Sequence, residues 1–182
     1  MMHIDIETRN LTDNLTKCGA YRYAQNAELL LLAVALRDEP PTVFDVAQGE
    51  PISAWVLDAL FDECTLKHAW NAQFERAVLS AHFGKPMPPD EWSCTMALAL
   101  QNGLPGALSE AGQALGVEKQ KDAIGKSLIN YFCVPCKPTK RNGGRTSNLP
   151  QHDLAKWSLF KEYCARDVEA EREIHRRIAG YV

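Results

Sequence analysis

The amino-acid sequence predicts an α/β fold, a mixed sheet covered by helices, from the order in which its apolar patterns occur. Segments with strand character come first and are joined by short links, and helical patterns fill most of the second half. The chain has 182 residues, of which 46% are hydrophobic and 24% charged, enough to bury a sizeable core. We therefore expect a single domain over residues 1–182.

Strand-like segments dominate the first part of the chain. The longest apolar run covers 29–36, and shorter segments with strand character lie at 3–7, 42–46 and 66–70. A helical pattern at 53–61 separates the last two of these strands.

Helical patterns follow the fourth strand. Asn71 can cap a helix over 72–83, and an apolar face predicts a long closing helix over 153–178. Proline and glycine residues predict a flexible basic loop over about 134–150. The remaining helices are expected at 95–101, 107–115 and 122–132.

Composition excludes several classes of protein. The longest wholly apolar run has eight residues, whereas a membrane-spanning helix needs ~18 to 20. The first residues lack the basic start and the apolar stretch of a signal peptide. Six cysteines are scattered along a chain that can build its own core, which favours free thiols in a reducing cytoplasm.

Charge is uneven along the chain. Residues 1–100 carry 14 acidic and 7 basic side chains, whereas residues 101–182 carry 9 acidic and 13 basic ones. Seven of the lysines and arginines lie between positions 117 and 148. An acidic half beside a basic segment indicates metal chemistry next to a polyanion, and an ordinary solvated surface is the alternative.

The first candidate motif is the run from His3 to Glu7. Because side chains alternate along a strand, Asp5 and Glu7 point to one face while Ile4 and Ile6 are buried on the other. Two neighbouring carboxylates repel each other without a cation, and hard oxygen ligands suit Mg²⁺ or Mn²⁺. A solvent-facing strand with two ordinary acids is the alternative.

The second candidate motif follows Trp70. If the strand ends there, Glu75 falls in the first turn or so of the next helix, near the sheet edge where α/β proteins place their sites. The positive end of a helix also favours a carboxylate. The alternative is an acid that only complements the helix dipole.

The third candidate motif lies on the closing helix. Tyr163 and Asp167 are four residues apart, so the phenol and the carboxylate share one helix face. A metal-ligating aspartate with a tyrosine hydroxyl beside it can hold and orient an attacking water. The alternative is a tyrosine packed in the core and an aspartate on an ordinary exposed, charged face.

Together and in this order, the three motifs resemble those of the DEDD, or DnaQ-like, superfamily of 3′→5′ exonucleases in its tyrosine-bearing branch. The resemblance covers essentially the whole chain. Segments 17–23, 94–99 and 137–142 look like the N-terminal proofreading domain of bacteriophage-type family A DNA polymerases. The resemblance implies an RNase H-like fold, a mixed five-stranded sheet flanked by helices, and the cytoplasm of a bacterial or phage-infected cell.

The same resemblance implies a set of site residues. Two divalent cations, Mg²⁺ or Mn²⁺, would be held by Asp5, Glu7, Glu75 and Asp167. Tyr163 would orient the nucleophilic water. The 3′-terminal nucleotide would meet Thr8, Leu11, Asn71 and Phe74. From their charge, we also expect contacts to backbone phosphates from Lys137, Lys140, Arg141 and Arg145.

The implied activity is hydrolysis of terminal phosphodiesters of DNA, which releases nucleoside 5′-monophosphates from a single-stranded or frayed 3′ end. A DNA polymerase, in cis or in trans, is the implied partner, and the chain is either free-standing or part of a longer protein. Glu75 departs from the family, which has aspartate there; we expect the longer side chain to be accommodated. The alternatives are an RNase D-like exoribonuclease and a catalytically weak nucleic-acid-binding or polymerase-accessory module.

Overall fold

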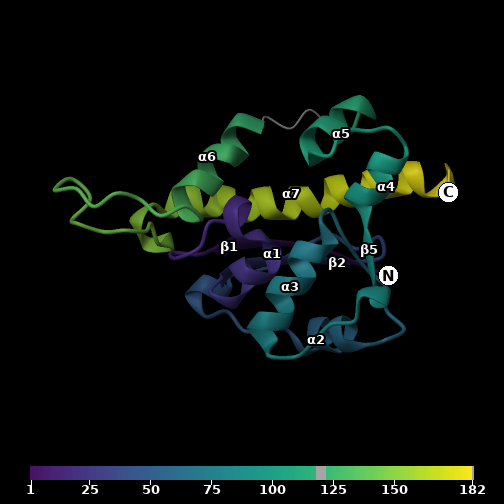
Figure 1. Ribbon diagram of the computed structural model, residues 1–182, viewed down its shortest axis with the longest axis horizontal. Helices are drawn as coiled ribbons and strands as arrows, with labels where there is room; N and C mark the ends of the chain where they lie inside the picture. Colours follow the sequence, from purple (N-terminus) through teal and green to yellow (C-terminus); the bar gives the residue numbers. More distant parts are fainter. Residues whose placement is uncertain (118–121, 182) are drawn as a thin grey trace.

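The described residues of a computed structural model, 1–117 and 122–181, contain one five-stranded sheet. Its strands are β1 (Met2–Arg9), β2 (Glu28–Leu36), β3 (Thr42–Phe44), β4 (Lys67–Ala69) and β5 (Trp92–Cys94). The strand order is β3-β2-β1-β4-β5 (Figure 1). β1 lies at the centre, antiparallel to β2 and parallel to β4, so the predicted mixed five-stranded sheet is confirmed.

Helices cover both faces of this sheet. They are α1 (Leu15–Gln25), α2 (Ala54–Phe61), α3 (Ala72–Phe83), α4 (Thr95–Gln101), α5 (Leu108–Ala114), α6 (Asp122–Phe132) and α7 (Leu154–Ile178). In Figure 1, α1, α2 and α3 lie on one side of the sheet, and the 25-residue α7 runs along the other side with α6 against it. α4 and α5 pack on the C-terminal half of α7.

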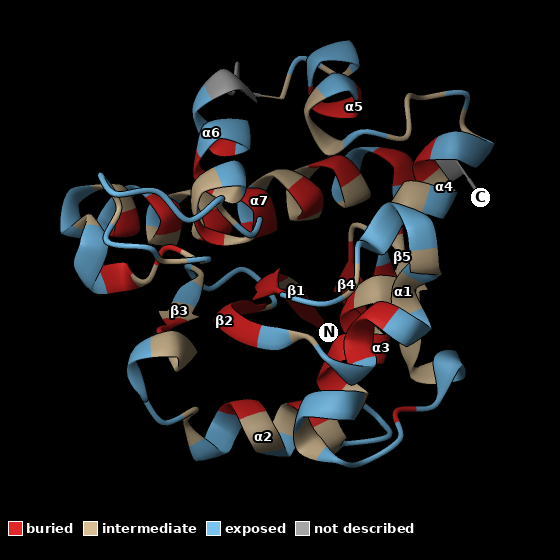
Figure 2. Ribbon diagram, turned by 60° about the vertical axis from the view of Figure 1, so that its left-hand side comes forward, coloured by how far each residue is buried: buried red, intermediate tan, exposed pale blue. Residues whose placement is uncertain are grey.

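Alternation along β1 determines which side chains face which layer. Ile4 and Ile6 are buried in a core with residues of α2 and α3. Asp5 and Glu7 alternate with them and pair with Ala33 and Leu31 of β2, two residues that pack on the α7 side. In Figure 2, buried residues recur along α7, the helix on that side of the sheet. The two acids of β1 are thereby directed toward α7.

Most of the predicted elements are present, with small shifts at their ends. The third strand is shorter than expected because Val46 starts a 3₁₀ helix over Val46–Gln48. Asn71 occupies the N-cap position of α3, but its side chain makes no capping hydrogen bond. Asp153 caps α7 by accepting a hydrogen bond from the backbone N–H of Lys156 at 3.0 Å.

Two elements were not predicted. Most side chains of α1 are exposed, and Gly19, with φ 75°, interrupts the helix, so no regular apolar period marks it in the sequence. β5 has only three residues and follows two prolines, which leaves too few positions to show alternation. Both elements depend on tertiary pairing: α1 packs on α3, and β5 completes the sheet beside β4.

Two further expectations can be checked in the described residues. No helix among them is long and apolar enough to cross a membrane. All six cysteines are free thiols, as expected.

A candidate metal centre formed by four carboxylates

Asp5 and Glu7 lie side by side on the central strand, facing α7. Their carboxylate oxygens and the Sγ of Cys164 all lie within 4.8 Å of one another. Glu7 is buried, and Asp5 is half-buried. A bulge between Glu7 and Thr8 interrupts the pairing with β2 directly after this pair. The structure thus brings together the two acids of the first predicted motif.

Glu75 comes to the same place from the first turn of α3. Its side chain is 5% exposed, and its Oε2 has no hydrogen-bond partner among the described residues. Burial raises the pKa of Glu75, and the charge of Asp5 raises it further. Glu75 therefore lies close enough to Asp5 for their charges to interact.

Asp167 and Tyr163 complete the cluster from α7. Asp167 is buried, and its charge raises the pKa of both Asp5 and Glu7. Burial, followed by the Asp167 carboxylate, raises the pKa of Tyr163, so the phenol keeps its proton at neutral pH. The alternative that placed Asp167 on an ordinary exposed helix face is wrong.

Electrostatics in the cluster favour a bound cation. Burial is the largest cause that raises the pKa of Asp5, Glu7 and Glu75, and repulsion from neighbouring carboxylates adds to it. Four acids held this close destabilise one another's charged forms. A divalent cation would remove this repulsion, and it would also give Glu75 Oε2 a partner. Oxygen donors of this kind match Mg²⁺ or Mn²⁺, so the residues present fit such a metal.

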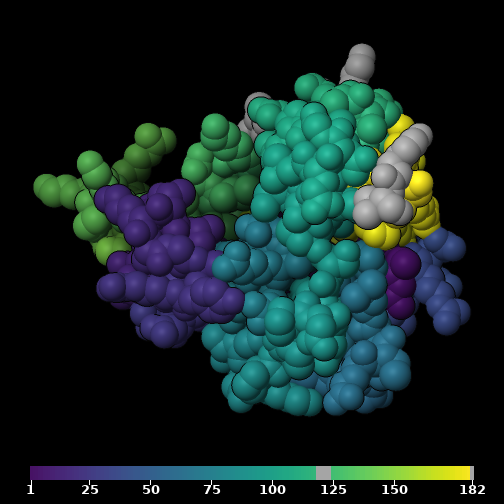
Figure 3. Space-filling model, turned by 45° about the vertical axis from the view of Figure 1, so that its right-hand side comes forward, coloured from purple at the N-terminus to yellow at the C-terminus, as the bar shows by residue number. Residues whose placement is uncertain are grey.

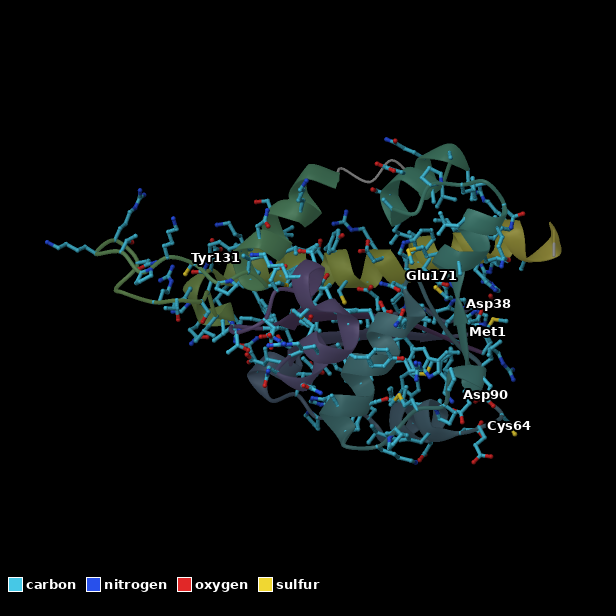
Figure 4. The ribbon with its side chains drawn as sticks, in the orientation of Figure 1. Met1, Asp38, Cys64, Asp90, Tyr131 and Glu171 are labelled. Atoms are coloured by element: carbon cyan, nitrogen blue, oxygen red, sulfur yellow. The ribbon has the colours of Figure 1, made fainter. Side chains whose placement is uncertain are left out.

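A second buried network lies one helical turn further along α7, where the sequence analysis proposed no functional residue. Glu171, labelled in Figure 4, is 2% exposed and accepts hydrogen bonds from Thr95 and, at 2.6 Å, from His3 Nδ1. The His3 ring stacks on His68, whose pKa burial lowers to about 3. Asp167 and Glu171 are four residues apart and so share one helix face, and this spacing is the sequence feature that could have indicated the network.

A pocket of about 570 Å³ opens beside the carboxylates. Glu7, Thr8, Leu11 and Phe74 line it together with residues of the β1–α1 connection. Asn71 is exposed and lies outside the lining, in contrast to its expected place beside Phe74. The sequence analysis missed Tyr23, which lines the pocket and shares a hydrogen bond with the Thr8 hydroxyl at 3.1 Å.

The predicted basic loop, here called the basic arm (residues 134–149), projects from one end of the molecule (Figure 1). It contains no helix or strand, but it is held by hydrogen bonds. The Asn142 Oδ1 accepts from the backbone N–H groups of Thr139 at 2.8 Å and Gly144 at 3.1 Å. Its Nδ2 donates to the Lys137 carbonyl at 2.8 Å. These bonds organise the tip of the arm.

The base of the arm is tied to β1 and α6 through Asn148. This buried residue accepts from Arg9 Nη1 at its carbonyl, at 3.0 Å, and its Nδ2 donates to the Tyr131 carbonyl at 2.9 Å. Arg145 Nε donates to the Asn148 side chain at 2.8 Å, so Arg145 helps to hold the base. Figure 3 shows the arm beside the purple segment that contains α1, and Figure 4 shows Tyr131 near the base of the arm.

The exposed charges of the basic arm are Lys137, Lys140 and Arg141. The basic stretch between positions 117 and 148 also includes residues 119 and 121, which lie outside the described residues. Trp157, which follows the arm in the sequence, is 2% exposed and packs in the core.

Comparisons with known proteins agree with this architecture. No family model matches the chain. The DNA polymerase of Bacillus phage SP02 is 47% identical over 182 residues, which cover 99% of this chain and 28% of that polymerase. The chain thus spans little more than a quarter of the length of this relative.

Among solved structures, one described as the apo form of a nuclease aligns over 98% of this chain and 71% of its own, with 16% identity and a TM-score of 0.52. Brucella melitensis NrnC with bound Mg²⁺ covers 97% of this chain and 73% of its own at 16% identity, with a TM-score of 0.44 that is too low to establish a shared fold. The chain is therefore homologous to a segment of a phage DNA polymerase and has an RNase H-like α/β fold found in a solved nuclease.

Proposed function

We propose that the chain is a metal-dependent 3′→5′ exonuclease that removes terminal nucleotides from DNA, as a proofreading domain does. The observation that carries this proposal is a set of acids from three elements that act on one another. Asp5 and Glu7 of β1 are spaced to share one ion, and the charges of Glu75 of α3 and Asp167 of α7 act on them. Homology to a segment of a DNA polymerase supports a substrate of this class.

The four carboxylates would hold two divalent cations, Mg²⁺ or Mn²⁺. When bound, such cations supply a nucleophilic hydroxide at neutral pH and stabilise the departing oxygen of the phosphodiester. Asp5, whose charge interacts with those of Glu7, Glu75 and Asp167, would contribute to the binding of both ions. Glu7 and Asp167 would hold one of them, and Glu75, with its unpartnered Oε2, would reach the other.

Tyr163 has the properties of a group that orients water without removing its proton. Its raised pKa keeps the phenol neutral, so it can donate one hydrogen bond and accept another. A neutral phenol is not a general base at pH 7, so Tyr163 would instead hold the attacking water in line with the phosphorus.

The pocket and the basic arm suit a single-stranded 3′ end. Glu7 joins the pocket to the carboxylates, and Leu11 and Phe74 provide apolar surface for the terminal nucleoside. The exposed Lys137, Lys140 and Arg141 would contact phosphates further along the strand, and contacts of this type carry little sequence preference.

The alternative RNase D-like activity differs from the proposed DNA exonuclease only in its tolerance of a 2′-hydroxyl at the terminal nucleotide. The accessory-module alternative differs in lacking hydrolysis altogether. DNA is favoured because the homologous segment belongs to a DNA polymerase.

The test compares four 5′-labelled oligonucleotides of one sequence: single-stranded DNA, a matched duplex, a duplex with a mismatched 3′ end, and single-stranded RNA. The proposal predicts nucleoside 5′-monophosphates from DNA, released faster from the single strand and the mismatched end, because a frayed end costs less to unpair. Equal rates on all three DNA substrates would remove proofreading, and faster hydrolysis of RNA would favour the RNase D-like alternative.

A further inference from the structure

A thiol lies inside the carboxylate cluster. Cys164 is fully buried on α7, and its Sγ donates a hydrogen bond to Asp5 Oδ2 at 3.3 Å. In the described part of the chain, the group of side chains spaced to hold a metal ion consists of Asp5, Glu7 and this cysteine. A soft sulfur donor therefore stands among hard oxygen donors.

Helix geometry directs this sulfur to the same place as Asp167. The two residues are three positions apart on α7 and share one face of the helix. Cys164 also packs in the core beneath the sheet with Phe160 and Val168, which leaves its side chain little freedom to turn away. A second observation points to a ligand here, because Oε2 of the buried Glu75, whose charge acts on Glu7, has no hydrogen-bond partner in the part of the chain that the structure describes.

We propose that this centre also takes a borderline-soft divalent cation of the Zn²⁺ type, with the Cys164 sulfur as a direct ligand beside Asp5 and Glu7. The inference rests on the carboxylate centre of the proposed function and concerns which cations can occupy it. Zn²⁺ accepts sulfur and oxygen donors in tetrahedral sites, whereas Mg²⁺ prefers oxygen.

The observed spacing suits such a site. With a Zn–S bond of about 2.3 Å, a Zn–O bond of about 2.1 Å and a tetrahedral angle, sulfur and oxygen lie ~3.6 Å apart. The Cys164 Sγ and Asp5 Oδ2 are 3.3 Å apart, so a shift of a few tenths of an ångström admits the ion.

The chemistry of occupation differs between the two kinds of cation. When a Zn²⁺-type ion binds, the S–H bond breaks, the proton passes to solvent, and a metal–sulfur bond replaces the hydrogen bond to Asp5; no electron is transferred. With Mg²⁺ the thiol keeps its proton and continues to donate to Asp5. Zn²⁺ is therefore expected to displace Mg²⁺ and to lower hydrolysis supported by Mg²⁺.

A second thiol near the cluster provides a matched control. Cys133 is half-buried, and its Sγ lies 3.7 Å from Glu7 Oε2, at hydrogen-bond distance for sulfur. It does not belong to the group of atoms spaced to share an ion. Cys64 is an exposed thiol and serves as a remote control.

The experiment titrates Co²⁺, as a spectroscopic substitute for Zn²⁺, into the metal-free protein and records absorption. A cobalt–thiolate bond gives a charge-transfer band in the near ultraviolet, which oxygen ligands do not give. The band is expected in the wild type, Cys133→Ser and Cys64→Ser, and is expected to be lost in Cys164→Ser. Calorimetric titration should show that Cys164→Ser binds Zn²⁺ more weakly than the wild type. The loss of a direct ligand should cost at least as much affinity as the loss of a residue that only hydrogen-bonds to a ligand, which is roughly 10- to 100-fold.

Absence of the band from the wild type, or its survival in Cys164→Ser, would overturn the proposal. Serine keeps a hydroxyl donor for Asp5, and Cys164→Ala is the second variant if the serine variant does not fold. Failure of the nuclease proposal would be seen separately, as a lack of Mg²⁺- or Mn²⁺-dependent hydrolysis by a wild-type protein that still shows the band.

Discussion

The ring of Tyr163 occupies the space that a side chain on Gly125 would need. A Cβ added to Gly125 on α6 would lie 2.1 Å from Cε2 of Tyr163 and 2.7 Å from its Cζ. The missing side chain allows α6 to lie directly against the tyrosine and to limit where its hydroxyl can point. Gly125 thus acts on the candidate site through Tyr163 without touching the carboxylates.

Gly125→Ala is expected to move the ring of Tyr163 and to lower kcat by up to about 100-fold, the loss typical of a misplacement of about 1 Å. Single-turnover hydrolysis measures this change, and Tyr163→Phe should show a similar loss. Gly112→Ala is the matched control, because its Cβ would meet atoms no nearer than 3.8 Å. Wild-type kcat in Gly125→Ala would show that the helix does not position the tyrosine.

Stability of the metal-free protein is expected to fall as pH rises above about 4, where carboxyl groups ordinarily titrate. The pKa values of Asp5, Glu7 and Glu75 are raised in the folded state. Between the ordinary and the raised values the folded state binds more protons than the unfolded state, so a rise in pH favours unfolding. Denaturant unfolding in chelator, from pH 5 to pH 8, measures the trend.

Two further unfolding measurements, one with Mn²⁺ and one on a variant, distinguish titration of this cluster from titration of other groups. Mn²⁺ should raise the free energy of unfolding more at the higher pH, where the carboxylates are charged. Asp5→Asn should stabilise the chelated protein at pH 8 by roughly 1–3 kcal/mol, since it removes a charge that repels the neighbouring carboxylates. Exposed Glu63→Gln is the control. A chelated Asp5→Asn variant no more stable than the wild type would contradict the electrostatic account.

Neutralising the exposed cations of the basic arm should weaken DNA binding in a salt-dependent way. For Lys140→Gln combined with Arg141→Gln, loss of two phosphate contacts should reduce the slope of log K against log salt by about 1.4 for a single strand. Lys85→Gln, at the far end of α3, should leave the slope unchanged. An unchanged slope in the double variant would show that the arm does not contact phosphates.

Removing Glu171 should destabilise the fold through the network that joins β1, α4 and α7. Glu171→Ala leaves His3 and Thr95 without their buried partner, and each buried polar group left unsatisfied costs roughly 1–3 kcal/mol. Exposed Glu169→Ala on the same helix should change the free energy of unfolding by less than about 0.5 kcal/mol. Equal effects of the two substitutions would show that the network contributes little.

Much of the fold could be predicted because its main elements carry strong local patterns. The alternation of Asp5 and Glu7 with Ile4 and Ile6 predicts both a strand and the face that the acids take, and the structure shows both. The spacing of Tyr163 and Asp167 similarly predicts a shared helix face. α1 and β5 could not be predicted, since pairing with distant elements stabilises them.

The candidate site was predictable where ligands are recognisable by residue type and spacing. It was not predictable where contacts join residues far apart in the chain. Cys164 gave no signal of its own, because its importance depends on its 3.3 Å distance to Asp5. The role of Asn148 likewise depends on its hydrogen bonds with Arg9 and Tyr131, which the sequence does not indicate.

The central claim is that the four carboxylates form one cation-dependent catalytic centre, and the most direct test is monophosphate release from single-stranded DNA by the wild type, Asp5→Asn and Asp167→Asn. The wild type should be inactive in chelator and restored by Mn²⁺ or Mg²⁺. Each variant should lose at least about 1000-fold in rate, because bound metal contributes several kcal/mol and each 1.4 kcal/mol is a factor of ten. Full cation-dependent hydrolysis by either variant, or a wild type that stays inert with every cation, would contradict the account.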